Sequence, residues 1–148
     1  MPERETLERA KEDERERKSP STQAGEFVRE EIHHIREGKH GARSPQQAIA
    51  IGLSKARRAG VKLSLPKGPA SVRKKAAQDT AAGKNRKGSG RKTSATRSRA
   101  VERALQRESR GAASREALAR QVKQSAARRG TQSRRKAALK AARTRRVA

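Results

Sequence analysis

The residues with the clearest chemistry in this sequence are its lysines and arginines, which recur in short runs along the C-terminal half. Examples are Arg73-Lys74-Lys75, Arg91-Lys92 and Arg134-Arg135-Lys136. Each cation that meets a nucleic-acid phosphate releases condensed counterion, so affinity grows with the number of contacts and falls with salt. The planar guanidinium of arginine can also bind two phosphate oxygens at once. The runs therefore predict binding to a polyanion.

Three histidines, His33, His34 and His40, form the second group whose chemistry has to be considered. On a helix, His33 and Glu37 would lie four residues apart, which can place two metal ligands on one face. No second pair completes a ligand set at such a spacing. We therefore predict no metal site, and we interpret the histidines as surface residues.

Residues for catalysis are not apparent in the sequence. It has no cysteine, which excludes disulfides and thiolate metal sites. It also lacks a glycine-rich phosphate loop that ends in Lys-Ser or Lys-Thr, and it has no paired carboxylates in an apolar setting. We predict a protein that is not an enzyme, with no catalytic residues and no cofactor.

The charge of the chain is distributed very unevenly. Its 148 residues include 40 Lys or Arg and 15 Asp or Glu, for a net charge of +25. Residues 1–21 carry six basic and seven acidic side chains, residues 22–65 carry eight and four, and residues 66–148 carry 26 and four. The segment charges are therefore −1, +4 and +22. Only 30% of the residues are hydrophobic, and low hydrophobicity with high net charge is typical of chains that do not fold alone.

The middle segment contains the pattern of a first helix. Val28, Ile32 and Ile35 follow each other at the spacing of one helical stripe, beside Phe27. Gly38 lies where a glycine commonly ends a helix. These residues predict a helix that starts near the candidate cap Thr22.

A second helix is predicted more sharply. Ser44 suits the N-cap, Pro45 the first helical position, and Gln47 the third position of a capping box. Ile49, Leu53 and Ala56 form its apolar stripe, and Gly60 should end it. The alternating residues Val61, Leu63 and Leu65 should then form an extended segment across the pair.

We therefore expect a mainly α protein with one small two-helix hairpin and a long, largely disordered basic tail. The expected parts are a charged leader at 1–21, helical or disordered; the hairpin at 22–65; a basic disordered linker at 66–98; and an Ala/Arg-rich basic tail at 99–148. In the tail, Ser98, Ser114 and Ser133 are each expected to cap a nascent Ala/Arg helix. Their thin apolar faces suggest that they become helical only when phosphates neutralise their arginines.

The hairpin resembles a small basic bacterial domain of unknown function. The resemblance rests on Lys39-His40-Gly41 and on Gln47-Ala48-Ile49-Ala50-Ile51-Gly52-Leu53-Ser54, followed by Ala56-Arg57-Arg58-Ala59-Gly60. Lys55 stands where many members carry an acidic residue. Members are short basic proteins often labelled DNA-binding without a defined mechanism, so the resemblance implies a bacterial origin more than a function. The tail is separately similar in composition to the tails of bacterial histone-like proteins.

Together these features predict a nucleoid-associated, histone-like protein of the cytoplasm that binds the DNA backbone with little sequence preference. Sequence-specific or single-stranded recognition usually needs aromatic stacking platforms, and the chain has one aromatic residue. The expected phosphate contacts are Arg57, Arg58, Lys62, Arg73, Lys74, Lys75, Arg91, Lys92, Arg128, Arg129, Arg134, Arg135, Lys136, Arg143, Arg145 and Arg146.

Two other functions remain open from the sequence. Basic tails also thread into ribosomal RNA, so the chain could be an RNA- or ribosome-associated assembly factor. Alternatively, the hairpin could bind a protein partner, or a second copy of itself, while the tail tethers it to nucleic acid. Binding to a membrane is not expected, because the tail lacks the Trp/Phe/Leu face of an interfacial helix.

Overall fold

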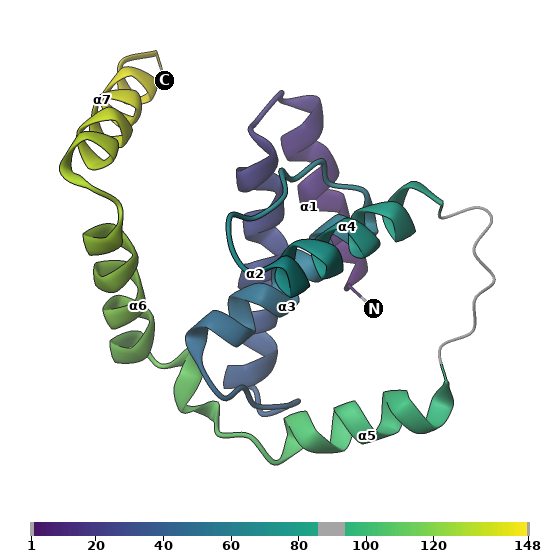
Figure 1. Ribbon diagram of the computed structural model, residues 1–148. Coiled ribbons are helices and arrows are strands. Elements are labelled where there is room, and N and C mark those ends of the chain that lie inside the picture. The colour runs from purple at the N-terminus through teal and green to yellow at the C-terminus, as the bar shows by residue number, and fades with distance from the viewer. Residues whose placement is uncertain (1, 86–93, 148) are drawn as a thin grey trace. The chain divides into compact units, whose positions relative to one another are not determined.

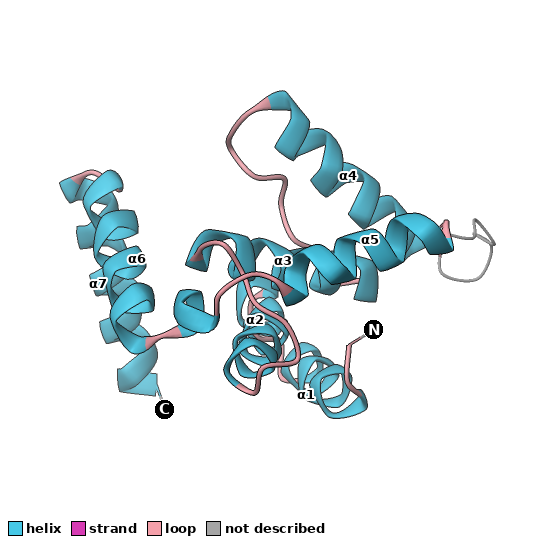
Figure 2. Cartoon of the chain, turned by 90° about the horizontal axis from the view of Figure 1, so that it is seen from below, coloured by secondary structure: helices cyan, strands magenta, loops and turns pink. Residues whose placement is uncertain are grey.

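The computed structural model describes residues 2–85 and 94–147, and this part of the chain is helical (Figures 1 and 2). The elements are α1 (Arg4–Arg15), α2 (Pro20–Arg36), α3 (Pro45–Ala59), α4 (Ala70–Lys84), α5 (Ala95–Gln106), the 3₁₀ helix η1 (Arg110–Ala113), α6 (Arg115–Arg128) and α7 (Thr131–Val147). No strand occurs among the described residues, so the prediction of a mainly α protein is confirmed. None of these helices is long and apolar enough to cross a membrane. The chain divides into two compact units, Met1–Ala113 and Ser114–Ala148.

Helices α2 and α3 pack against each other where the hairpin was predicted, but they belong to a larger unit with α1, α4 and η1, so the prediction of a separate two-helix module is wrong. Local side chains set the ends of both helices. The cap of α2 is Ser19, not Thr22, because the Ser19 hydroxyl accepts a hydrogen bond from the Thr22 amide at 3.3 Å. In α3 the Ser44 hydroxyl accepts from the Gln47 amide at 3.2 Å, as the sequence predicts. Gly60 ends α3 with φ of 103°, in the left-handed region that favours glycine.

The core of the first unit is built mostly from alanine. Of the ten buried hydrophobic residues in the described part of the chain, eight are alanines, and the other two are Phe27 and Ile35. Each of these two large residues belongs to its own small cluster. Small side chains let the helices approach closely. At the crossing of α2 and α3, a Cβ atom on Gly52 would lie only 2.7 Å from the Cα atom of Val28.

Helix α1, in the charged leader, packs against α2 (Figure 1). Ala10 is buried, and Leu7 packs against the cluster that contains Phe27. An ion pair between Arg9 Nε and Glu26 Oε2, 2.8 Å apart, links the two helices. This docking could not be predicted, because one leucine and one alanine make a very weak apolar stripe.

Helix α4 corrects the prediction of a disordered segment after the hairpin. It packs against α3 and buries Ala76 and Asp79. Its Gly83 lies so close to α3 that a Cβ atom there would overlap the carbonyl oxygen of Arg57. Burial of alanine, glycine and one carboxylate leaves almost no trace in a count of large apolar residues, and this is why the sequence predicted disorder here.

The segment that follows α5 also contributes to the first core. Ala112 and Ala113 of η1 are buried in the cluster around Ile35. Hydrogen bonds hold this segment against α2 and the loop after it: the Ala42 amide donates to the Ser109 carbonyl at 3.1 Å, and the Arg36 guanidinium of α2 donates to the Ala113 carbonyl at 3.0 Å. By contrast, α5 itself has no buried residue.

The second unit consists of α6 and α7. Ser114 caps α6 as predicted, since its hydroxyl accepts from the Ala117 amide at 3.1 Å. The predictions for Ser98 and Ser133 are wrong, because Ser94 caps α5 and Ser133 lies inside α7. No residue of α6 is buried, and Val122 of α6 and Leu139 of α7 are 66% and 63% exposed. The structure shows both segments as helices in the chain alone, which corrects the expectation that they become helical only against phosphates.

Candidate nucleic-acid interface

The densest group of basic side chains lies on α6 and α7. The unit Ser114–Ala148 carries 12 Lys or Arg and one acidic residue, Glu116, for a net charge of +11. Seven of the predicted phosphate contacts lie here with exposed side chains: Arg128, Arg129, Arg134, Arg135, Lys136, Arg143 and Arg145. Arg146 also lies in α7, but its side chain is outside the described part of the structure. With a single acidic residue in the unit, few of these cations can be neutralised within it.

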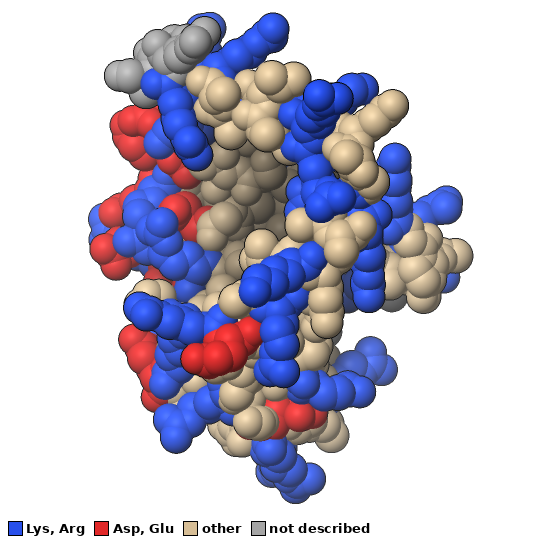
Figure 3. Space-filling view, turned by 90° about the vertical axis from the view of Figure 1, so that its left-hand side faces the viewer, with Lys and Arg blue, Asp and Glu red and all other residues tan. Residues whose placement is uncertain are grey.

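The predicted contacts in and after α4 have different surroundings. Arg73 and Lys74 are exposed. Lys75 is also largely exposed, but its ammonium group lies 2.7 Å from a carboxylate oxygen of Asp79. Arg91 and Lys92 lie outside the described residues. On the face drawn in Figure 3, Lys and Arg side chains cover much of the surface, whereas Asp and Glu gather in a few patches.

At the end of α3 only part of the predicted set is accessible. Arg58 and Lys62 are exposed. Arg57 is 8% exposed, and its guanidinium donates a hydrogen bond to the Ser64 carbonyl at 3.1 Å. Helical geometry turns neighbouring residues by about 100°, so Arg57 faces the extended segment while Arg58 faces outward. Arg57 thus supports the fold and is not available to a phosphate.

Asp79 is the buried charge that joins α4 to α3. Its carboxylate accepts hydrogen bonds from Ser54 at 2.7 Å, from Arg58 at 2.9 Å and from Lys75 at 2.7 Å. Burial would raise the pKa of Asp79, but the three hydrogen bonds, led by that from Lys75, outweigh burial and hold the pKa below its usual value. The charged carboxylate of Asp79 therefore forms ion pairs with two of the predicted phosphate contacts, Arg58 and Lys75, and partly neutralises them.

The histidines do not lie as their spacing suggested. His33 is exposed, and the Glu37 carboxylate lies 3.1 Å from the ammonium group of Lys39. Instead, the structure brings His34 and His40 together, with their ring centroids 6.2 Å apart.

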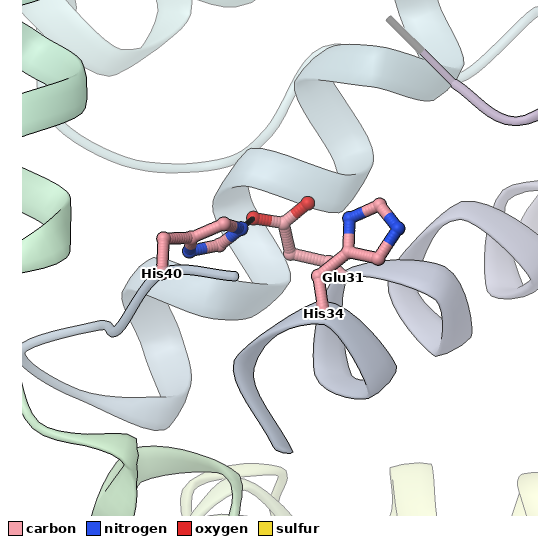
Figure 4. Close-up of side chains that lie close together, drawn as sticks. All are labelled: Glu31, His34 and His40. Carbon is pink, nitrogen blue, oxygen red and sulfur yellow. Dashed lines mark ion pairs between the residues drawn. The ribbon is translucent and has the colours of Figure 1, made fainter. Parts of the chain in front are cut away.

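Glu31 of α2 lies between these two rings (Figure 4). His40 Nε2 is 3.1 Å from Glu31 Oε1. His40 is nine residues beyond Glu31, and the loop turns back at Gly38, whose φ is 79°. A separation of nine residues that includes a loop does not follow helical periodicity, so this cluster could not be predicted from the spacing of its residues.

Glu3, just before α1, completes the surroundings of the histidines. Its carboxylate lies 2.8 Å from His34 Nε2 and 3.1 Å from Lys39 Nζ. The hydrogen bonds from His34 and then from Lys39 lower the pKa of Glu3 to about 2. The start of the leader is thereby tied to the C-terminal end of α2.

Comparison with known proteins finds a family match in the segment that contains α2 and α3. Residues 19–68 match a family described as a family of unknown function, DUF6496. The matched segment contains α2, α3 and the extended residues after them, and it leaves α1 and α4–α7 outside. No curated protein and no solved structure matches the chain. Because the matched family has no assigned function, it does not bear on nucleic-acid binding.

Proposed function

We propose that this chain is a non-enzymatic, histone-like DNA-binding protein that contacts duplex phosphates with little sequence preference. The observation that carries the proposal is the concentration of charge, since residues 66–148 hold +22 of the net charge of +25. Exposed cations on α6 and α7 form the main contact set. Arg73, Lys74 and Lys62 are further exposed cations in the first unit, where Arg58 is exposed too but partly neutralised by Asp79.

The arrangement of cations around α7 favours contact with the backbone over the reading of bases. Three consecutive cations, Arg134, Arg135 and Lys136, span about 200° of the helix circumference, because successive residues are turned by about 100°. Arg143 and Arg145 add charge about two to three turns further along. A helix that is basic on several faces can meet phosphates in many orientations, which supports affinity without a fixed register on the bases.

Burial of the single aromatic residue favours a double helix over single-stranded nucleic acid. Proteins that bind single strands stack bases on exposed aromatic side chains. Phe27 is 1% exposed and belongs to the core. Charge on the helices is then the chief source of affinity. The first unit would be the folded part that carries these helices, and we include in the proposal that it associates with a second copy or with a protein partner. We also propose that the protein is located on the nucleoid.

Fluorescence anisotropy with several unrelated DNA duplexes of equal length tests the proposal. The wild-type chain should bind all of them within a few-fold. The triple variant Arg134→Gln, Arg135→Gln, Lys136→Gln should weaken binding to every duplex alike, by up to about 100-fold at ~0.15 M salt, because up to three phosphate contacts are lost.

A matched control removes the same charge from the leader. The variant Arg4→Gln, Lys11→Gln, Arg15→Gln also lowers the net charge by three, but these exposed residues lie among acidic side chains of α1. It should bind DNA almost as the wild type does. Equal weakening by both variants would show that only net charge matters. Much tighter binding to ribosomal RNA than to duplex DNA would instead support the assembly-factor alternative.

A further inference from the structure

Three side chains at the C-terminal end of α2 have the donor atoms of a metal site. Glu31, His34 and His40 each offer one ligand atom, and these atoms all lie within 4.8 Å of one another (Figure 4). Two come from α2 and the third from the loop that follows it. Glu31 is 1% exposed as a side chain, and His34 and His40 are 12% and 17% exposed. The cluster is therefore shielded from bulk water but close to the surface.

Each imidazole has one nitrogen fixed from outside the cluster and the other turned toward Glu31. His40 Nδ1 lies 3.1 Å from the Gly41 carbonyl oxygen, while its Nε2 lies 3.1 Å from Glu31 Oε1. His34 Nε2 bonds the carboxylate of Glu3 at 2.8 Å. The ring nitrogen of His34 that faces Glu31 in Figure 4 is thus Nδ1. An outer carboxylate or carbonyl that orients the ring in this way is typical of metal-ligating histidines.

The carboxylate of Glu31 is buried and is satisfied only in part. Neither of its oxygens accepts a well-aligned hydrogen bond. Lys55 Nζ lies 2.6 Å from Oε2 and pairs with it, whereas Oε1 has the His40 ring nitrogen at 3.1 Å. Because a buried carboxylate normally accepts several aligned hydrogen bonds, Oε1 can accept a cation held between it and the two imidazoles.

The separations between the ligand atoms are compatible with tetrahedral coordination of a small metal ion. Ligand atoms bonded to Zn²⁺ at about 2.0–2.1 Å lie about 3.3 Å from each other in a tetrahedron. The separation of His40 Nε2 from Glu31 Oε1, 3.1 Å, is already close to that value. The widest separation in the cluster, at most 4.8 Å, would close by small side-chain rotations. Two imidazoles and one carboxylate suit late first-row transition metals better than Mg²⁺ or Ca²⁺.

We propose that Glu31, His34 and His40 bind one divalent transition-metal ion, with Zn²⁺ as the reference ion and a fourth position open to water. The ion would tie the loop at His40 to α2 and would offset the charge of Glu31 together with Lys55. The site is independent of the phosphate-binding residues, so it would add a structural metal to the first unit whatever the chain binds.

The direct test uses the full-length, untagged chain after treatment with a chelator. Isothermal titration with ZnCl₂ should give one tight site per chain, and Zn²⁺ should raise the midpoint of thermal unfolding. The same concentration of MgCl₂ should do neither. If Zn²⁺ gives no saturable one-to-one binding, or if Mg²⁺ has the same effect, then the proposal is wrong.

Variants then assign the ligands. His40→Ala should weaken Zn²⁺ binding by at least about 100-fold and Glu3→Gln by about 10-fold, since outer partners alone contribute that much in known sites. Lys55→Gln should strengthen binding, because it removes the competing cation from Glu31. The matched control is His33→Ala, which removes an exposed histidine two residues from Glu31 and should leave affinity unchanged.

A measurement on the wild-type chain guards against variants that fail to fold. The ring resonances of all three histidines can be followed by NMR during the Zn²⁺ titration. His34 and His40 should shift together and saturate at one equivalent, while His33 stays in place. A shift of His33 without His40 would assign the binding to a surface histidine and would overturn the proposal.

Discussion

Removal of the Asp79 carboxylate should release α4 from α3. Asp79 is 3% exposed and accepts three hydrogen bonds from side chains, of which those from Ser54 and Arg58 cross from α3 to α4, while that from Lys75 lies within α4. A hydrogen bond to a charged group contributes about 1.5–3 kcal/mol. The Arg58 side chain is 56% exposed, so its ion pair adds only about 0.2–1 kcal/mol to the docking, and the pair with Lys75 adds nothing to it because both residues belong to α4. We expect Asp79→Ala to cost about 2–4 kcal/mol of docking free energy.

Native-state hydrogen exchange of the α4 amides measures this loss where it occurs. Since about 1.4 kcal/mol corresponds to a factor of ten, exchange in α4 should accelerate by about 30- to 1,000-fold, while α2 changes little. Asp79→Asn keeps an acceptor for Ser54 and should show a smaller acceleration. The control Glu102→Ala removes the same charge from an exposed position of α5 and should leave α4 unaffected.

Unchanged protection of α4 in Asp79→Ala would refute this reasoning. It would mean that the contacts of Ala76 and Gly83 with α3 are sufficient to dock the helix without the carboxylate. Acceleration throughout the first unit, rather than in α4 alone, would show instead that α4 unfolds only together with the hairpin.

Two further predictions concern the first unit. Gly52→Ala should lower the free energy of unfolding by about 1–2 kcal/mol, because the new Cβ would lie 2.7 Å from Val28 Cα. The control Gly25→Ala, whose new Cβ would meet nothing within 4 Å, should raise it by up to about 1 kcal/mol. Unfolding in urea measures both changes. Glu3 has a folded-state pKa of about 2 against an ordinary value of 4.5, so its contribution to stability is present above pH 4.5 and lost as the pH falls toward 2. Glu3→Gln should flatten that part of the profile of unfolding midpoint against pH, and an identical profile for both proteins would contradict the assignment.

The elements that local chemistry specifies could be predicted from the sequence. Ser44 and Gly60 mark the ends of α3 because a hydroxyl cap and a left-handed C-terminal residue are local requirements. Ser114 marks the start of α6 for the same reason. The basic segments were likewise visible, since charge is read directly from composition.

Contacts between distant segments could not be predicted in the same way. The docking of α4 depends on Asp79, an acidic residue in a basic segment, and on the buried Ala76. A count of large apolar residues cannot detect either of them. The cluster around Glu31 forms because a loop returns His40 to α2, while the helical spacing of His33 pointed to the wrong histidine. Among the candidate phosphate contacts, Arg57 was misplaced because the direction in which it faces depends on the extended segment after α3.

The salt dependence of DNA affinity tests the central claim most directly. The dissociation constant of the full-length chain for one DNA duplex would be measured between about 50 and 200 mM salt. With about 6–10 phosphates engaged, the logarithm of the association constant should fall against the logarithm of salt concentration with a slope of about −5 to −9. A slope near zero would show that phosphates do not provide the affinity, and would contradict the proposal that the basic helices bind the DNA backbone.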